Sequence, residues 1–202
     1  MSRTPRLVAV AVATCLLAGL AGCTGDSDMS APSTSPAGAS PAAMDLDAVP
    51  ACPAVPKVAP RDDGLPPLRL ACLGSGPAVR LSDLRGTPMV LNVWAAWCTL
   101  CPDEEPFFAA LHRKVGDKVR FFGIHYKAGR SQGLQSARDF GVFFPSVHDA
   151  DGDRTVKALR TTAPPQTFFV TAAGRVAHRH VGVLKSQAQF DALVAKYLGV
   201  KV

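Results

Sequence analysis

The amino-acid sequence predicts an α/β fold, a three-layer sandwich in which helices flank a mixed central sheet, with an N-terminal extension before it. Three observations lead to this prediction. Apolar runs that suit buried strands alternate with segments of helical character, and a hairpin and a last helix then close the chain. Residues 50–202 suit one domain with one hydrophobic core.

The extension begins with an export signal. Two arginines precede an apolar stretch, 7–18, which is too short and wrongly flanked for a stable membrane span. The next motif, Leu20-Ala21-Gly22-Cys23, matches the bacterial lipobox. We therefore predict that residues 1–22 are a lipoprotein signal peptide and that Cys23 is the lipidation site. The alternative is an ordinary signal peptide followed by a chance cysteine.

Residues 23–49 are predicted to be a flexible tether between the lipid and the domain. The region is rich in Ala, Pro, Ser and Gly and has too few large apolar side chains to offset the entropy of ordering. Without the two arginines of the signal, 20 Lys and Arg stand against 16 Asp and Glu. This charge is mild, and no basic run is interleaved with aromatic residues, so the sequence argues against a nucleic-acid partner.

The first elements of the domain are strands and one helix. Residues 78–81 suit a short strand, and residues 88–94 are apolar throughout, as a central strand should be. A helix is predicted over 98–115, and Pro106 predicts a kink inside it. Another apolar strand is predicted over 119–126.

The remaining elements are shorter and end in a hairpin. The predicted order is a helix over 134–140 ending at Gly141, a strand over 144–148, a turn over 149–153, a helical turn over 155–159, and strands over 166–171 and 176–183. A final helix follows, which Ser186 can cap with Gln189 three residues later, and it runs to Leu198 before Gly199.

The motif Cys98-Thr99-Leu100-Cys101 places two thiols between a buried strand and a helix. Partial positive charge and free N–H groups at a helix N-terminus favour a thiolate. The pair therefore suits making and breaking disulfides. The alternative, half of a zinc site, lacks a second Cys pair or paired histidines at metal spacing in the sequence.

The other four cysteines have different predicted fates. Cys15 leaves with the signal peptide, and Cys23 is the predicted lipid site. Cys52 and Cys72 remain as a pair, and an exported protein can keep a disulfide. A structural bridge between them would contribute about 3 kcal/mol on the chain-entropy model. The alternative is a second redox pair that exchanges with Cys98.

The order of elements and motifs resembles the thioredoxin fold, and more closely its membrane-tethered, extracytoplasmic branch, the ResA/TlpA/DsbE group. The likeness covers about residues 65–200. It rests on Leu81-Ser82-Asp83-Leu84-Arg85-Gly86, Val90-Leu91-Asn92-Val93-Trp94-Ala95-Ala96-Trp97-Cys98, Cys101, Glu104, Pro106, Pro165-Gln166-Thr167-Phe168-Phe169-Val170 and Gly174.

The resemblance implies a role for each residue of the motif. Cys98 would be the exposed attacking thiol, and Cys101 would resolve the mixed disulfide. Cytosolic thioredoxins carry a buried Asp where this chain has Asn92, and in the tethered branch an acidic residue at the position of Glu104 serves instead. The alternative for Glu104 is a solvated side chain on the helix surface, as we expect for Asp103 and Glu105.

The resemblance also implies the substrate-contacting residues. Trp97 would form an exposed apolar rim beside the thiols, whereas Trp94 would lie in the core. Thr99 and Leu100 lie between the cysteines, where the family usually has Gly-Pro or Glu-Pro. Pro165 would follow a cis peptide bond, pack against the disulfide and expose backbone to a substrate strand.

The function that follows is that of a thiol–disulfide oxidoreductase, anchored by lipid to the cell membrane and facing outside the cytoplasm. Its expected partners are the thiols and disulfides of exported proteins and a thiol-reducing electron donor in the membrane. We expect a monomer with no cofactor or metal beyond the redox-active disulfide Cys98–Cys101. Reduction of apocytochrome c cysteines is the favoured task, although nothing in the sequence fixes the reduction potential.

Three alternative functions stay open. A Cu(I) metallochaperone on the same fold could use the Cys pair with His125 or His148, which lie at strand ends. A general disulfide-forming oxidant would use the same thiols in the opposite direction. A redoxin-type peroxidase would place a threonine before its reactive cysteine, whereas Thr99 follows Cys98. We expect His178 and His180 to lie on a solvated strand face.

Overall fold

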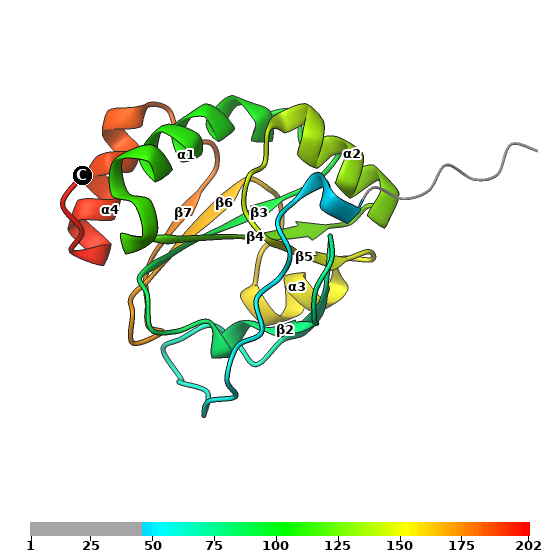
Figure 1. Cartoon of the computed structure of the whole chain (residues 1–202), viewed down its shortest axis with the longest axis horizontal. Coiled ribbons are helices and arrows are strands. Elements are labelled where there is room, and N and C mark those ends of the chain that lie inside the picture. Colours follow the sequence, from blue (N-terminus) through cyan, green and yellow to red (C-terminus); the bar gives the residue numbers. More distant parts are fainter. Residues whose placement is uncertain (1–45) are drawn as a thin grey trace, which may run out of the picture. The chain divides into compact units, whose positions relative to one another are not determined.

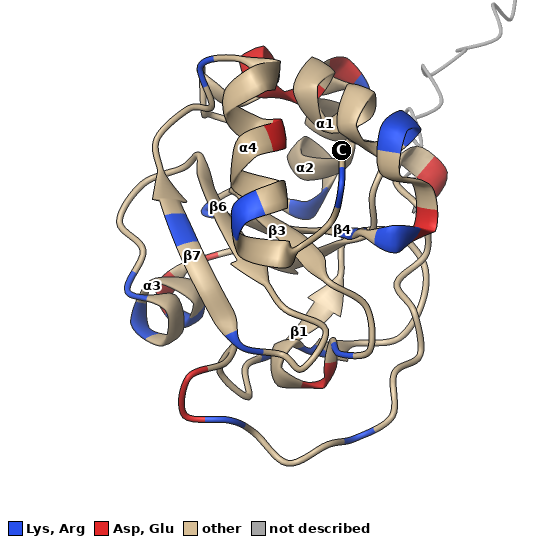
Figure 2. Cartoon of the chain, turned by 90° about the vertical axis from the view of Figure 1, so that its left-hand side faces the viewer, with Lys and Arg blue, Asp and Glu red and all other residues tan. Residues whose placement is uncertain are grey.

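The computed structural model describes residues 46–202. The predictions for the signal peptide 1–22, for Cys15 and Cys23 and for most of the tether lie outside the described residues. Within residues 46–202, no helix is both long enough and apolar enough to cross a membrane. Basic and acidic residues are interspersed along the visible elements, as Figure 2 shows.

The core of the fold is a seven-stranded mixed sheet with the strand order β2-β1-β5-β4-β3-β6-β7. Strands β3, β4 and β5 run parallel, and all other neighbours are antiparallel. The strands are β1 (Arg69–Cys72), β2 (Val79–Arg80), β3 (Met89–Trp94), β4 (Arg120–Tyr126), β5 (Ser146–Asp149), β6 (Gln166–Val170) and β7 (Val176–Val181).

Helices cover both faces of this sheet, so the predicted three-layer sandwich is confirmed. The helices are α1 (Cys101–Val115), α2 (Arg130–Phe140), α3 (Asp153–Leu159) and α4 (Gln187–Leu198), with 3₁₀ turns η1 (Leu46–Ala48), η2 (Leu81–Asp83) and η3 (Gly116–Lys118). Figure 1 shows α1, α2 and α4 on one face and α3 on the other. The right-handed crossover rule for parallel strands explains why α1 and α2 share a face. The connections from β3 to β4 and from β4 to β5 run across the sheet in one direction and carry α1 and α2, so both helices lie on the same face. The connection from β5 to β6 runs back in the opposite direction and carries α3, which lies on the other face (Figure 1).

Local sequence signals fix several element ends. The Ser186 hydroxyl oxygen accepts a hydrogen bond from the Gln189 N–H at 3.2 Å and so caps α4. Gly141 ends α2 with a left-handed φ of 76°, which favours glycine. Every residue of β3 is buried, as expected for a central strand covered on both faces.

Several element boundaries differ from the sequence prediction by a few residues, and three differences have a clear cause. Helix α1 begins at Cys101 rather than at Cys98, since Cys98 lies in a turn where its N–H donates to the Ala95 carbonyl. Helix α2 begins at Arg130 rather than at residue 134. The Gln132 side-chain oxygen accepts a hydrogen bond from the Gly129 N–H at 3.0 Å and so caps the helix at this earlier, polar start. Strand β1 was not predicted: its four residues are too few for a clear pattern, and long-range pairing with β5 defines it.

The packed part of the chain begins slightly before residue 50. The turn η1 precedes it, and Val49 is only 2% exposed within the core. The last residues assigned to the tether therefore pack on the domain. Helix α1 continues through Pro106, and the kink predicted there stays a prediction.

The predicted Cys52–Cys72 disulfide is present, and both of its cysteines are buried. It ties the segment that precedes the sheet to β1. The Cys52 N–H also donates to the Ser75 carbonyl at 2.9 Å. Gly76 makes this approach possible, because its φ is +103° and a Cβ there would lie 2.6 Å from the Cys52 carbonyl oxygen. Neither cysteine lies at the start of a helix, since Cys72 ends β1 and Cys52 precedes the sheet, and this favours the structural interpretation over a second redox centre.

The expectation of a solvated Glu105 is wrong. Its side chain is 3% exposed, and its Oε2 has no hydrogen-bond partner among residues 46–202. Glu105 follows Cys101 by four residues and precedes Phe108 by three, so it shares the buried face of α1. Burial, and then the neighbouring Glu104 charge, raise its pKa from 4.5 to about 8.

We predict that replacing Cys52 and Cys72 together by alanine lowers the free energy of unfolding by about 3 kcal/mol, because the unfolded chain regains conformational freedom. Urea unfolding followed by circular dichroism measures this loss. Disulfide exchange through Cys98 and Cys101 serves as the control and should persist. An unchanged urea midpoint would contradict the stabilising role of the bridge.

We predict that the free energy of unfolding falls as the pH rises from about 4.5 to about 8, since the folded protein keeps a proton on Glu105 that the unfolded chain releases. Glu105→Gln should be more stable than the wild type at pH 8, by a few kcal/mol as an order of magnitude, and this advantage should shrink toward pH 4.5. Asp103→Asn, an exposed site on the same helix, is the matched control. Parallel pH dependences of wild type and Glu105→Gln would refute the prediction.

Candidate active site

The two cysteines of the motif form a disulfide where β3 gives way to α1. Their Cα atoms are 5.5 Å apart. Cys98 precedes the helix and is 5% exposed, whereas Cys101 is its first residue and is 1% exposed. In this oxidised pair Cys98 is less accessible than the predicted exposed nucleophile, but it is the outer of the two sulfurs.

Exposed apolar side chains surround Cys98. Trp97 is 50% exposed and Leu100 is 49% exposed, and Thr99 between them is exposed as well. The Trp97 indole N–H donates to the Lys127 carbonyl at 2.8 Å, which fixes the ring at the end of β4. Trp94 is fully buried, as predicted. Apolar surface of this kind beside a disulfide suits contact with another polypeptide.

Glu104 is fully buried, so the solvated alternative is excluded. Its Oε1 accepts a hydrogen bond from the Asn92 Nδ2 at 2.7 Å, and its Oε2 accepts one from the Leu184 N–H at 3.1 Å. Burial raises its pKa from 4.5 to about 7, while these two donors oppose the shift. Glu104 lies one turn beyond Cys101 on the buried face of α1, where a carboxyl group that titrates near neutral pH can exchange a proton.

Two further polar atoms lie in the sheet beside Glu104. Asn92 on β3 and Thr167 on β6 are direct cross-strand partners, so their side chains share one face. The Asn92 Oδ1 and the Thr167 Oγ1 are buried and have no hydrogen-bond partner among residues 46–202. Thr167 is a site residue that the sequence-based prediction lacks, although a threonine within an apolar strand is a usable signal.

The peptide bond between Pro164 and Pro165 is cis, as the resemblance implied. Pro165 has no N–H, and its carbonyl accepts the Gly182 N–H at 3.0 Å. The backbone groups of Pro165 are thus already used. The carbonyl of Pro164, for which the described residues offer no donor, is the acceptor left at this turn. That the turn exposes backbone to a substrate strand stays a prediction.

His125 and His148 contact each other instead of the cysteines. Their Nδ1 atoms are 3.1 Å apart, and their rings are stacked with an interplanar angle of 18°. Burial lowers the pKa of His125 to about 3, so its ring is neutral. Across residues 46–202, no group of three or more His, Cys, Asp or Glu is arranged to hold a metal ion. His178 stacks on Tyr197 with ring centroids 4.1 Å apart.

Sequence comparison identifies a family and several relatives to which this chain is similar. The sequence model of the AhpC/TSA family matches residues 63–179. The thiol:disulfide interchange protein DsbE of Pseudomonas fluorescens biotype C is 35% identical over 117 residues, which cover 57% of this chain and 64% of that protein. The DsbE protein of Yersinia pestis is 33% identical over 118 residues, 56% of this chain and 61% of that one. The chain thus spans about three-fifths of the length of these curated relatives.

Solved structures share the fold. A secreted Mycobacterium tuberculosis disulfide oxidoreductase, described as homologous to E. coli DsbE, superposes with a TM-score of 0.56 at 23% identity and covers 64% of this chain and 96% of that one. A thioredoxin family protein of Chlorobium tepidum TLS gives a TM-score of 0.57 at 22% identity, over 70% of this chain and all of that one. Because the family match extends over more than half of the chain, the protein belongs to the AhpC/TSA family and has the thioredoxin-like fold.

Proposed function

We propose that the protein is an extracytoplasmic thiol–disulfide oxidoreductase that exchanges disulfides with exported proteins through Cys98 and Cys101. The observation that carries this proposal is the Cys98–Cys101 disulfide with a buried carboxyl group, Glu104, one helical turn beyond Cys101. The relatives described as thiol:disulfide interchange proteins support the same reaction.

The exchange reaction begins from the reduced pair. The Cys98 thiolate attacks one sulfur of a partner disulfide, forms a mixed disulfide and expels the other partner sulfur as a thiolate. The start of α1 favours this thiolate through its free N–H groups. Cys101 then attacks the Cys98 sulfur, which releases the second partner thiol and restores the Cys98–Cys101 disulfide. The partner gains two electrons and this protein loses two.

Glu104 serves the second step. Cys101 is almost fully buried and must lose its proton before it can attack. Glu104 accepts this proton, because its pKa of about 7 lets it exist in both protonation states near neutral pH. Asn92 is a positioning residue, since its amide holds one carboxylate oxygen toward the sheet.

The buried carboxyl group also favours the reductase direction. A thiolate on Cys101 is disfavoured by burial and by a negative charge one turn away. Disfavouring the thiolate destabilises the reduced form, which lowers the reduction potential and makes the pair an electron donor. Apocytochrome c cysteines are the proposed substrate, and a thiol-reducing donor in the membrane regenerates the pair. The chain acts as a monomer, anchored to the cell membrane through lipid on Cys23.

The Cu(I) alternative has no comparable support among the described residues. It needs a histidine beside the Cys pair, whereas the Nδ1 atoms of His125 and His148 are directed at each other. We therefore propose exchange rather than metal transfer.

We predict that Cys101→Ser accumulates mixed disulfides between Cys98 and exported proteins, because the resolving thiol is missing. Non-reducing electrophoresis of cells followed by mass spectrometry identifies the trapped partners, and apocytochrome c should be among them. Cys98→Ser, Cys101→Ser together is the control and should trap nothing. Trapping by Cys98→Ser instead of Cys101→Ser would show that the attacking and resolving roles are reversed.

We predict that Glu104→Gln slows the release of partner from the mixed disulfide at pH 7 by on the order of 100-fold, because the proton acceptor for Cys101 is lost. In the wild type this rate should rise with pH through about 7, and in Glu104→Gln that inflection should be absent. Stopped-flow fluorescence with a disulfide peptide measures the rate.

Asp103→Asn changes an exposed acid on the same helix and should leave both rate and pH profile as in the wild type. A purely structural role of Glu104 would lower the rate equally at every pH. An inflection near pH 7 that survives in Glu104→Gln would remove Glu104 from the proton transfer.

A further inference from the structure

A pocket of about 410 Å³ lies at the end of the sheet opposite to the disulfide. Thr87, which precedes β3, and Arg120, which begins β4, line it, whereas Cys98 follows the other end of β3. The length of a six-residue strand, about 20 Å, therefore separates this pocket from the redox centre. The redox reaction makes no use of it.

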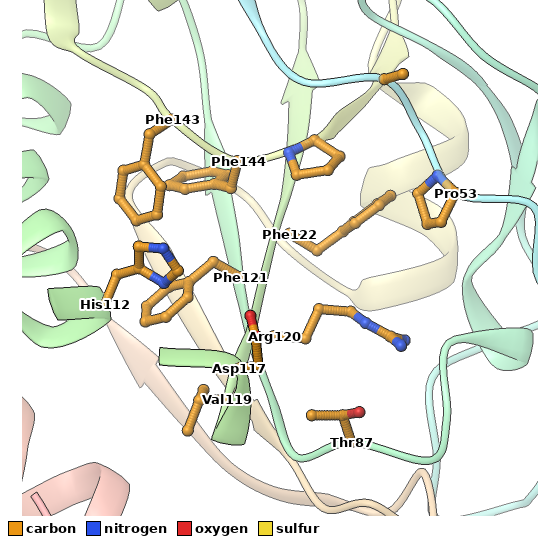
Figure 3. Close-up of a pocket in the computed structure, with 12 residues that line it drawn as sticks. Pro53, Thr87, His112, Asp117, Val119, Arg120, Phe121, Phe122, Phe143 and Phe144 are labelled. Atoms are coloured by element: carbon orange, nitrogen blue, oxygen red, sulfur yellow. The ribbon is translucent and has the colours of Figure 1, made fainter. Parts of the chain in front are cut away.

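One side of the pocket is an aromatic wall. The His112 ring stacks on Phe143 with centroids 5.0 Å apart, and the Phe121 ring lies 5.6 Å from Phe143. Figure 3 shows these three rings on one side of β4, while Phe122 and Pro53 lie on the other side. Flat apolar walls of this kind suit the apolar body of a small ligand.

Arg120 brings an unpaired positive charge to the same pocket. Its side chain is half-buried, and its guanidinium forms no hydrogen bond or ion pair with any residue of 46–202; its Nη1 is fully buried. Figure 3 shows the side chain extending from β4 between Phe122 and Thr87. Asp117 also lines the pocket, but it is exposed and forms no ion pair with Arg120. A half-buried guanidinium with no acceptor favours an anion.

A second donor without an acceptor among residues 46–202 is the backbone N–H of Phe121, the residue after Arg120. The Gly123 N–H points toward β5, because it donates to the Pro145 carbonyl at 2.8 Å. Phe121 lies two residues earlier on β4, so its N–H points to the same side. Strand β5 begins only at Ser146, opposite Gly123, and no hydrogen bond joins the Phe121 N–H to the described residues. The open edge of β4 therefore presents an N–H beside Arg120.

We propose that this pocket binds a small organic anion with an apolar body, whose carboxylate accepts hydrogen bonds from the Arg120 guanidinium and the Phe121 N–H. The apolar body lies against Phe122 and Pro53, on the side of β4 to which the Arg120 side chain extends (Figure 3). The volume falls within the range of about 300 to 1,000 Å³ that is usual for small-molecule sites. The Cys52 disulfide holds one wall in place, because the residues on either side of this cysteine, Ala51 and Pro53, line the pocket.

The test uses two probes of the same shape, 2-naphthoate and its uncharged amide, 2-naphthamide. Isothermal titration calorimetry of the full chain in detergent should show saturable 1:1 binding of naphthoate, at least about tenfold tighter than that of the amide. Arg120→Gln should abolish this preference, whereas Arg113→Gln, an exposed arginine on α1, should keep it. Phe122→Leu, which removes the flat ring but keeps an apolar side chain, should weaken the binding of both probes.

The uncharged amide partitions into detergent more than the carboxylate, so each affinity is calculated from the free probe concentration, measured by dialysis against the same detergent without protein. Retained disulfide exchange by Arg120→Gln shows that the variant is folded. If Arg120→Gln loses disulfide exchange, its binding data are set aside, and the ratio of the naphthoate and naphthamide affinities of the wild type decides whether the pocket prefers an anion. Equal affinities of the wild type for both probes, no saturable binding, or a preference that survives in folded Arg120→Gln would overturn the proposal.

Discussion

Burial of the Glu104 carboxyl group one helical turn from Cys101 is the constraint on which the rest of the active site depends. A carboxylate removed from water is costly unless donors compensate for the lost hydration. The Asn92 amide on β3 and the Leu184 N–H before α4 supply one donor to each oxygen. Helix α1, the central strand and the chain that enters the last helix must therefore meet at one point, and this meeting also brings Cys101 into the core.

The sheet separates two kinds of chemistry. Beyond the carboxyl end of β3, the motif cysteines form a disulfide beside the exposed side chains of Trp97 and Leu100. At the amino end of β4, the part of the strand before Gly123 is not paired with β5, and Arg120 has no partner there among residues 46–202. The Cys52–Cys72 disulfide connects the segment before the sheet to β1 and so shapes this second end. The two disulfides thus lie in different parts of one fold, in line with the different roles proposed for them.

Much of the fold could be predicted because local signals agreed with the tertiary structure. The uniform apolar character of β3, the cap at Ser186 and the glycine at 141 each set an element or its end. Prediction failed where long-range contacts decided. Strand β1 exists because β5 pairs with it, and Glu105 is buried because helical spacing places it beside Phe108 rather than because of its polarity. The start of α1 moved to Cys101 because a local turn holds Cys98 outside the helix.

By itself the sequence determined the thiol pair, its place between a strand and a helix and the fold class, because motif spacing and the order of the segments carry that information. The sequence predicted a bridge between Cys52 and Cys72 with exchange through Cys98 as the alternative, and the structure shows the bridge. Only the tertiary structure decided that Asn92 holds Glu104, that His125 pairs with His148 and that Thr167 joins the polar group beside Glu104. Only the tertiary structure, too, leaves Arg120 without an acceptor within the part of the chain that it describes. These features depend on residues far apart in the chain whose side chains meet only when the sheet and its helices pack, and no local pattern encodes such a meeting.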